Sequence, residues 1–430
     1  MISVKGFFKK KSLHEFGFTY FGLLANGISL FLINVILGRS LEKEWFAIFS
    51  LSILALSTIA EMSDLGLNGS LLRFIPFYKQ SNEPEKLKQV IRTIWRWRVW
   101  LSIILTLGGI VLSYPIAKYV FDQPQITNYL AFSLFGIGGV VLLGFISTYL
   151  QATQQFFKNS LIQSLKGLSR LALTAIFIFS GFNDIYLFLL VYISIPWILL
   201  TFYYRVLPRN LEKIQIEAEV KEKLHSQIAN FSFWLTIWSL SAILASRVDQ
   251  IMLSNLLGLE KVAIYTIAFQ FIYLYSIASQ SITSVLMPKY NSLHSKEEII
   301  SLTKKLMKWL IPITILLFLI IPPSKYLITF VFGDKYIDSM PVYLVLSYGM
   351  ALNLFNIPLS LIVTTFNKTK LIAISGFIQL IINVGLNLVL IPKFGIIGAG
   401  LTFGLGIIFS IVYNSICSSY LIKKEEINIA

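Results

Sequence analysis

The sequence predicts an all-α membrane protein with about twelve transmembrane helices arranged in two six-helix lobes. Three observations lead to this fold class. First, 56% of the 430 residues are hydrophobic and 13% are charged, whereas an average soluble domain carries about 25% charged residues. Second, apolar stretches of about 20 residues, the length that crosses a bilayer as a helix, follow one another along the chain. Third, a short pattern in the first half of the chain returns in the second half.

The apolar stretches define the expected helices in order. They cover residues 16–37, 45–72, 97–120, 128–152, 161–181, 185–205, 229–255, 261–287, 308–332, 340–365, 370–391 and 397–421. The connections between them are short, and none has room for a soluble domain. The single cysteine excludes an internal disulfide, and the three histidines stand far apart in polar stretches, so neither a metal site nor a cofactor is expected.

The distribution of the 36 Lys and Arg residues predicts the orientation in the membrane. The N-terminus, the connections from even to odd spans and the C-terminus together hold 25 of them, and the opposite side holds 7. Positive residues accumulate on the cytoplasmic side, so both termini are expected in the cytoplasm. The net charge of +15 is then a topology signal, and no nucleic-acid partner is expected. The basic and aromatic run 95–100, "WRWRVW", is interpreted as a set of interfacial anchors.

The repeat divides the chain into two halves. Ala47-Ile48-Phe49 follows the first span and Ala263-Ile264-Tyr265 follows the seventh. Six spans per half give both halves the same orientation in the membrane, and transporters built in this way bind substrate between the halves. The lobes are therefore expected at 1–208 and 229–430, with a cytoplasmic linker at 209–228.

Two cations inside the fifth span point to an anionic cargo. Lys166 and Arg170 stand four residues apart and thus share one helix face. A charged side chain at the centre of a membrane helix costs about 2.5–3.5 kcal/mol on insertion scales, so it usually faces a cavity or a partner. Spans five and six contain no acidic residue. Because lysine and arginine together suit phosphate, we expect this pair to bind a phosphate-bearing ligand. The alternative is snorkelling to the cytoplasmic surface, which is easier for Lys166 than for the deeper Arg170.

Further polar residues follow helical faces in the second half of the chain. Arg247, Gln250, Gln280 and Asn383 are candidates for substrate binding, and Asp249 beside Arg247 is a candidate for ion coupling. The competing interpretation is structural. Ser, Asn and Gln stripes join membrane helices through hydrogen bonds of about 0.6–2 kcal/mol each, and Arg247 and Asp249 can neutralise each other.

Four segments carry a resemblance to a known family. They are "SDLGLNGSLLRFIPFY" (63–78), "SRVDQIMLSNLLGLEKVAIYTIAFQ" (246–270), "VFGDKYIDSMPVYLVLS" (331–347) and "LNLVLIPKFGIIGAGLTFGLG" (386–406). In their order and spacing they resemble the polysaccharide transporters of the multidrug/oligosaccharidyl-lipid/polysaccharide (MOP) exporter superfamily, and in particular the Wzx-type O-antigen and capsule flippases. The MATE transporters belong to the same superfamily. Ala47 and Ala263 depart from the glycine that this family often has there.

The resemblance implies a V-shaped bundle of two lobes that alternates between inward-open and outward-open states. The implied cargo is an oligosaccharide on undecaprenyl pyrophosphate, moved from the cytoplasmic to the outer leaflet of a bacterial cytoplasmic membrane for O-antigen, lipopolysaccharide or capsule synthesis. The implied partners are membrane lipid, a polysaccharide polymerase and a chain-length regulator, and the chain is expected to be a monomer. Arg73 matches the arginine of the family's "GL…R…P" segment, where it can receive the head group or serve as an interfacial anchor.

The membrane potential favours outward movement of anions by about 2.3 kcal/mol per charge per 100 mV. We expect the return of the empty carrier to be coupled to a proton or sodium ion, with Asp249 and Asp64 as candidate carboxylates.

Two other functions remain open at the level of sequence. A MATE-type multidrug antiporter is expected to have acidic and aromatic residues in its cavity, whereas the deep charges here are mainly basic. A membrane polysaccharide polymerase or glycosyltransferase usually carries a long extracytoplasmic loop, and the outer connections here, such as 118–128, are short. The chain is therefore predicted not to be an enzyme.

Overall fold

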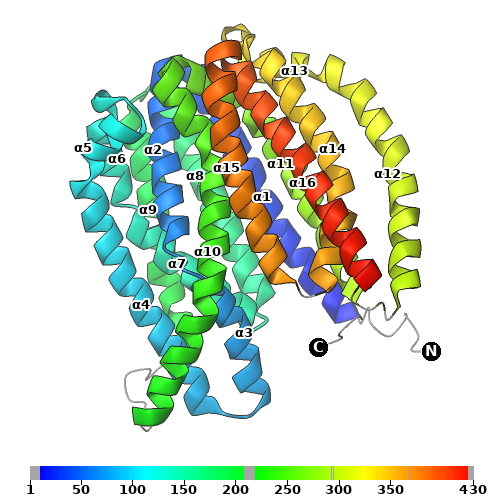
Figure 1. Ribbon diagram of the computed structural model, residues 1–430. Coiled ribbons are helices and arrows are strands. Elements are labelled where there is room, and N and C mark those ends of the chain that lie inside the picture. Colours follow the sequence, from blue (N-terminus) through cyan, green and yellow to red (C-terminus); the bar gives the residue numbers. More distant parts are fainter. Residues whose placement is uncertain (1–9, 208–217, 292, 294, 367, 425–430) are drawn as a thin grey trace. The chain divides into compact units, whose positions relative to one another are not determined.

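A computed structural model describes residues 10–207, 218–291, 293, 295–366 and 368–424, apart from the side chains of a few helix residues such as Gln280. The described residues form helices and short connections (Figure 1). The chain divides into two compact units, which we call unit 1 (Met1–Ile243) and unit 2 (Leu244–Ala430).

Unit 1 is built from the first nine α-helices and the beginning of the tenth. Their bounds are α1 Lys10–Ser40, α2 Lys43–Met62, α3 Leu67–Gln80, α4 Pro84–Val111, α5 Ser113–Pro115, α6 Thr127–Leu134, α7 Ile137–Ala152, α8 Phe156–Phe179, α9 Ile185–Tyr203 and α10 Ala218–Leu257. Short π and 3₁₀ turns complete this unit at Ile116–Val120, Pro124–Ile126 and Tyr204–Val206.

Unit 2 contains the end of α10 and six further helices. Their bounds are α11 Leu259–Asn291, α12 Lys296–Ser324, α13 Tyr326–Phe332, α14 Ser339–Thr365, α15 Thr369–Phe394 and α16 Ile396–Lys424, with a 3₁₀ turn at Asp334–Tyr336. The repeated tripeptides occupy matching places in the two units, because each begins four residues into its helix, α2 or α11. All six of their side chains are at most 5% exposed, so the repeated residues are core residues.

The predicted all-α membrane class is confirmed. Each of the twelve predicted spans falls largely on helical residues, which is consistent with the predicted number of spans. In the part of the chain that the structure describes, nine helices are long and apolar enough to cross a membrane, and the bent pair 124–134 and 137–152 makes a tenth. The chain is therefore a multi-pass membrane protein of the all-α class.

The structure departs from the sequence prediction at some boundaries. The span predicted at 45–72 is not one helix, because α2 ends at Met62 and α3 is a separate helix. Of the predicted linker 209–228, which stays a prediction, residues 209–217 lie outside the described residues, and from Ala218 onward the chain belongs to α10. In unit 1, Leu224 and Ile228 of α10 are buried in the core that contains residues of α3, α4 and α7. The predicted lobe bounds, 1–208 and 229–430, stay a prediction.

Candidate functional site

A sharp elbow joins α2 to α3 and places an acidic residue at the start of α3. Leu65 and Gly66 have φ values of 43° and 68°, in the left-handed region that side chains with a β-carbon rarely adopt. At this elbow the Asp64 carboxylate accepts a hydrogen bond from the backbone N–H of Asn68, at 3.0 Å. The elbow thus converts one predicted span into two helices with a carboxylate at their junction.

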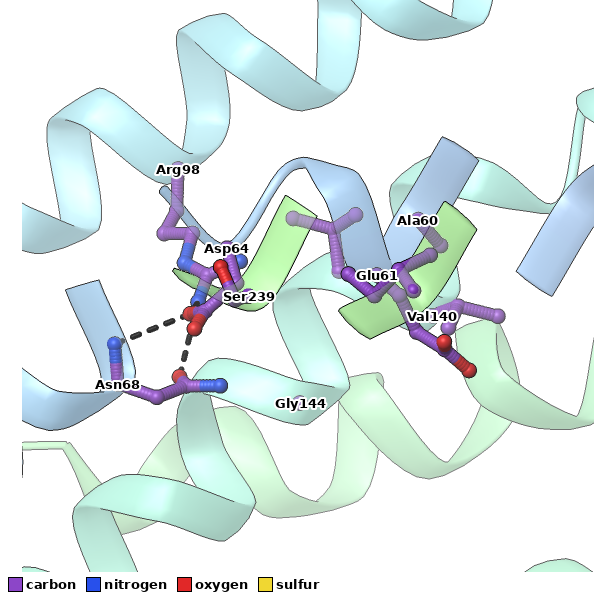
Figure 2. Close-up of a pocket in the computed structure, with 10 residues that line it drawn as sticks. Ala60, Glu61, Asp64, Asn68, Arg98, Val140, Gly144 and Ser239 are labelled. Atoms are coloured by element: carbon purple, nitrogen blue, oxygen red, sulfur yellow. Dashed lines mark hydrogen bonds and ion pairs between the residues drawn. The ribbon is translucent and has the colours of Figure 1, made fainter. Parts of the chain in front are cut away.

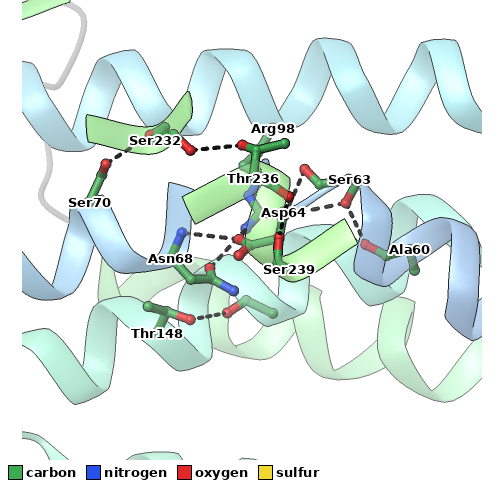
Figure 3. A network of polar contacts seen from close by, with 11 residues as sticks. Ala60, Ser63, Asp64, Asn68, Ser70, Arg98, Thr148, Ser232, Thr236 and Ser239 are labelled. Carbon is green, nitrogen blue, oxygen red and sulfur yellow. Dashed lines mark hydrogen bonds and ion pairs between the residues drawn. The ribbon is translucent and has the colours of Figure 1, made fainter. Parts of the chain in front are cut away.

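Arg98 of α4 fastens this elbow (Figure 3). Its side chain is 3% exposed and forms an ion pair with Asp64. It also donates to the side-chain oxygen of Asn68 at 2.8 Å and to the carbonyl and hydroxyl oxygens of Ser63, each at 3.3 Å. Carbonyl groups at the end of a helix lack a helical partner. Arg98 therefore holds the end of α2 and the start of α3 at the same time.

A cavity of about 310 Å³ adjoins this ion pair within unit 1 (Figure 2). Asp64 is the more accessible member of the pair, because its side chain is 25% exposed. The Nε atom of Arg98 is buried and has no hydrogen-bond partner among the described residues. The cavity is lined by Ala60, Glu61, Asp64, Asn68, Arg98, Val140, Val141, Gly144, Ser239 and Ile243.

The first part of α10 closes this region with polar side chains. The hydroxyl groups of Ser232 on α10 and Ser70 on α3 lie 2.9 Å apart (Figure 3). Nearer the start of α10, Nε2 of His225 lies 3.0 Å from the Thr93 hydroxyl of α4. Ser239, two turns after Ser232, lines the cavity itself. Four helices of unit 1 thus contribute polar groups to the cavity or to its surroundings.

The predicted cation pair lies on α8, at a different place in unit 1. Arg170 is 7% exposed, donates from Nη2 to the carbonyl oxygen of Tyr192 on α9 at 3.0 Å, and lies over the Tyr192 ring at 4.4 Å from its centroid. Lys166 is half-buried one turn earlier. No carboxylate of the described residues pairs with either cation. Among the described residues, a carbonyl dipole and a ring face are therefore what balances the positive charge of Arg170.

A polar seam continues from this pair toward the start of α8. Gln163, one turn before Lys166, donates to the Ser147 hydroxyl of α7 at 3.1 Å. That hydroxyl donates in turn to the side-chain oxygen of Asn159 at 2.5 Å. The face of α8 that carries the cations is thus polar over about three turns, as its 3.6-residue spacing predicts.

Close glycine contacts hold α8 against α1. A β-carbon on Gly167 would lie 2.7 Å from the backbone Cα of Asn26, and one on Gly22 would lie 2.7 Å from the Cα of Ser160. Both separations are too short for any side chain. Only glycine at these two positions lets the helices approach so closely.

Unit 2 contains a buried carboxylate with neutral partners. Asp249 of α10 is 5% exposed and accepts hydrogen bonds from the Tyr265 hydroxyl at 2.9 Å and from the Asn387 amide at 2.7 Å. The Asn387 amide also donates to the side-chain oxygen of Asn383 at 2.6 Å, and Asn383 donates to the carbonyl of Ala245 at 3.1 Å. The side-chain oxygen of Asn387 is buried without a partner among the described residues. The cluster is rich in oxygen atoms, and each of these hydrogen bonds has a neutral donor.

The hydrogen bonds and ion pairs described above do not include the remaining predicted site residues. Arg73 is exposed on α3, and its guanidinium lies 5.8 Å from the centroid of the Phe74 ring. Arg247 and Gln250 are half-buried on α10. The Gln280 side chain lies outside the described residues. The structure thus brings together Lys166 with Arg170, and Asp249 with Asn383, and it pairs Asp64 with a residue that was not predicted to belong to a site.

The interfacial interpretation of the 95–100 run is wrong for Arg98. Arg96 and Trp100 are exposed, in agreement with that interpretation, but Arg98 turns inward because the elbow offers it a carboxylate and an unpaired carbonyl. One signal in the sequence could have identified it. Buried polar side chains recur along α4, at Gln89, Thr93, Arg98 and Ser102, and their spacing of four to five residues keeps them on one side of the helix.

Comparison with known proteins identifies the family. The family model described as polysaccharide biosynthesis protein matches residues 14–294. A putative O-antigen transporter of Shigella flexneri is 25% identical over 398 residues, which cover 89% of this chain and 93% of the relative. An uncharacterized membrane protein of Methanocaldococcus jannaschii is 24% identical over 422 residues, which cover 93% of this chain and 82% of the relative.

Solved structures agree in fold. An inward-facing multidrug resistance MATE family transporter of the MOP superfamily has a TM-score of 0.67 at 15% identity. The aligned region covers 92% of this chain and 95% of the transporter. The lipid II flippase MurJ in an inward closed conformation has a TM-score of 0.69 at 15% identity. Here the aligned region covers 93% of this chain and 86% of MurJ. The chain therefore belongs to the polysaccharide biosynthesis protein family and has the all-helical membrane fold of the MOP transporters.

Proposed function

We propose that this protein is a flippase that moves undecaprenyl-pyrophosphate-linked oligosaccharides from the cytoplasmic to the outer leaflet for surface polysaccharide synthesis. Membership of the polysaccharide biosynthesis family supports a role in this pathway. The likeness to a putative O-antigen transporter supports transport as that role. The proposal further places the chain in a bacterial cytoplasmic membrane with both termini in the cytoplasm, on the basis of the 25-to-7 distribution of its Lys and Arg residues.

The uncompensated cations on α8 are the observation that carries the proposal. Arg170 lies 14 residues from the start of α8, about 21 Å along the helix, and no carboxylate of the described residues pairs with it or with Lys166. A buried cation without a counter-charge is costly, and a diphosphate would supply that charge. Arg170 offers a planar fork of N–H donors, and Lys166 offers a compact positive charge one turn away, which together suit two linked phosphates.

We assign ion coupling to Asp249 in preference to Asp64. Asp249 receives its hydrogen bonds from neutral groups, and beside it the Asn387 side-chain oxygen is buried without a partner in the described part of the chain. A sodium ion or a proton would balance the negative charge of this cluster. Asp64 already has Arg98 as a permanent counter-charge, so it is less suited to the binding and release of a cation.

The cation pair also separates this proposal from its alternatives. An antiporter for cationic drugs would place substrate beside carboxylates, and the basic face of α8 would repel such a substrate. A polymerase or glycosyltransferase would need catalytic groups outside the membrane. A contact with a polymerase and a chain-length regulator, and the monomeric state, stay predictions.

Complementation of a flippase-deficient strain that makes a defined lipid-linked oligosaccharide tests the proposal. We expect the wild type to restore surface polymer, and the double variant Lys166→Ala/Arg170→Ala to fail although it inserts normally into the membrane. Lys158→Ala is the matched control. It removes a cation from the same helix, but Lys158 is exposed and its ammonium group donates a hydrogen bond to the neighbouring Gln155 side chain, at 2.8 Å.

Two results would contradict the proposal. If the double variant restores polymer as well as wild type does, the two cations serve as membrane anchors and do not bind cargo. If the wild type fails in strains that make several different lipid-linked sugars, and purified protein binds none of these lipids, the flippase function itself is wrong. Activity that survives the collapse of every ion gradient would remove the coupling role of Asp249.

A further inference from the structure

We propose that the cavity beside Asp64 and Arg98 in unit 1 is a sugar subsite, which receives one uncharged sugar residue of the cargo. This inference rests on the proposed flippase function and extends it to a cavity to which the cation pair does not contribute. Figure 2 shows Arg98, Asp64 and Asn68 together on one side of the cavity, and Glu61 beside Ala60 and Val140.

The charges around the cavity argue against a phosphate there. Asp64 and Arg98 neutralise each other as an ion pair, and Glu61 adds a further carboxylate to the lining. The lining residues therefore carry a formal charge of −1, which repels a phosphate. The pyrophosphate of the cargo thus needs a different site, and the cations on α8 provide one.

The hydrogen-bonding groups around the cavity argue for hydroxyl groups as ligands. The buried Nε of Arg98 has no acceptor among the described residues. The oxygen atoms of Asp64, Asn68 and Ser239 can accept hydrogen bonds at the same cavity. A metal ion would satisfy the oxygen atoms but not the N–H group beside them. A sugar hydroxyl both donates and accepts, so neighbouring hydroxyls on one ring can satisfy both kinds of group.

The apolar lining residues and the size of the cavity fit a single sugar ring. Val140, Val141 and Ile243 also line the cavity and can pack against the C–H face of a ring. The volume of about 310 Å³ lies at the lower end of the range of about 300–1,000 Å³ for small-molecule sites. One sugar ring fits within this volume, whereas a whole oligosaccharide repeat unit would not.

Gly144 offers a way to fill the cavity without disturbing its surroundings. It lines the cavity, and a β-carbon placed on it meets no atom within 4 Å. The variant Gly144→Leu would thus project a side chain into open space, and leucine also has the higher helix propensity. Gly108 of α4 is a matched control, because it likewise has no atom within 4 Å of an added β-carbon and does not line the cavity.

The experiment compares binding of two kinds of lipid to the purified full chain in lipid nanodiscs. One is undecaprenyl pyrophosphate alone, and the other is the same lipid carrying a single glucose, galactose or N-acetylglucosamine. We expect at least one sugar to strengthen binding to wild type by about tenfold, which corresponds to one or two hydrogen bonds. Gly144→Leu should abolish that gain and leave binding of the bare lipid unchanged, whereas Gly108→Leu should retain the gain.

The outcomes separate this inference from the proposed function. If bare undecaprenyl pyrophosphate binds but no sugar adds affinity, or if Gly144→Leu retains the gain, the subsite is refuted while the flippase proposal stands. If binding of the bare lipid depends on sodium and Gly144→Leu removes that dependence, the cavity is a cation site and the inference is wrong. If neither kind of lipid binds, the flippase proposal fails and the subsite fails with it.

Discussion

The ion pair between Asp64 and Arg98 gives a quantitative prediction for a double-mutant cycle. Removal of one partner from a buried pair costs about 3–5 kcal/mol, because the other charge is left without compensation. Arg98 is 3% exposed, but the Asp64 side chain is 25% exposed and keeps its bond from the Asn68 backbone. We therefore expect the lower value, about 3 kcal/mol, for Arg98→Gln and likewise for Asp64→Asn.

The double variant should be much less harmful than the sum of the single variants. With both charges removed, the two amides can still bond to each other and to Ser63, so we expect a loss of about 4 kcal/mol in place of the additive 6. The resulting coupling energy of about 2 kcal/mol lies within the range for contacting residues. The assay is equilibrium unfolding in detergent micelles, followed by tryptophan fluorescence.

An exposed ion pair on the same helix serves as the control for this cycle. Lys86 forms an ion pair with Glu83, and the two side chains are 40% and 37% exposed. Exposed pairs contribute little to stability, so Lys86→Gln should leave the unfolding curve unchanged. Additive effects of Asp64→Asn and Arg98→Gln, or single variants as stable as wild type, would refute the view that Arg98 fastens the elbow.

Three further predictions follow from the other clusters. Asp249→Asn should make transport in proteoliposomes independent of the sodium and proton gradients, because the amide keeps a similar shape without the charge; gradient dependence equal to that of wild type would exclude Asp249 as the coupling residue. Gly167→Leu should destabilise unit 1 by more than about 3 kcal/mol, because a β-carbon at this position meets backbone at 2.7 Å. The control Gly108→Leu should melt at the same temperature as wild type, and equal melting of both variants would contradict the close contact of α1 and α8. Lys166→Gln/Arg170→Gln should weaken binding of undecaprenyl pyrophosphate by about 100-fold, the value of two charge-assisted contacts, and unchanged affinity in the same nanodisc assay would exclude the pair as the phosphate site.

The membrane helices could be predicted from the sequence because lipid imposes a simple rule on every span. A segment that crosses a bilayer must be long, apolar and helical, and the windows from 16–37 to 397–421 meet these conditions locally. The elbow at Leu65 was not visible in the same way. The span predicted at 45–72 runs through Ser63, Asp64 and Gly66, and the left-handed backbone at Leu65 and Gly66 interrupts the helix there.

The candidate sites were predictable only where their members share one helix. Lys166 and Arg170 lie one turn apart on α8, so helical periodicity alone brings them together. Arg98 and Asp64 are 34 positions apart and meet because the elbow redirects the chain, which no local pattern encodes. Composition therefore predicts that a membrane chain will shield its buried charges, but only tertiary structure shows which groups shield them.

The same distinction applies to the carboxylate of unit 2. The spacing of Asn383 and Asn387 marks one polar face of α15, and Asp249 marks another on α10. Their contact links residues 138 positions apart. Whether Asp249 bonds to Arg247 or to an amide depends on how α10 is rotated about its axis. The sequence periodicity of α10 does not determine that rotation.

The glycine contact between α1 and α8 has a consequence for biogenesis. Gly22 and Ser160, whose backbones meet there, are separated by 138 positions, and chain synthesis at about 5–20 residues per second takes roughly 7–28 seconds to cover that distance. During this time α1 is in the membrane without its partner and exposes the groove formed around Gly22 and Asn26. A protein that shields small-residue grooves in newly inserted helices would therefore act on α1 before α8 emerges.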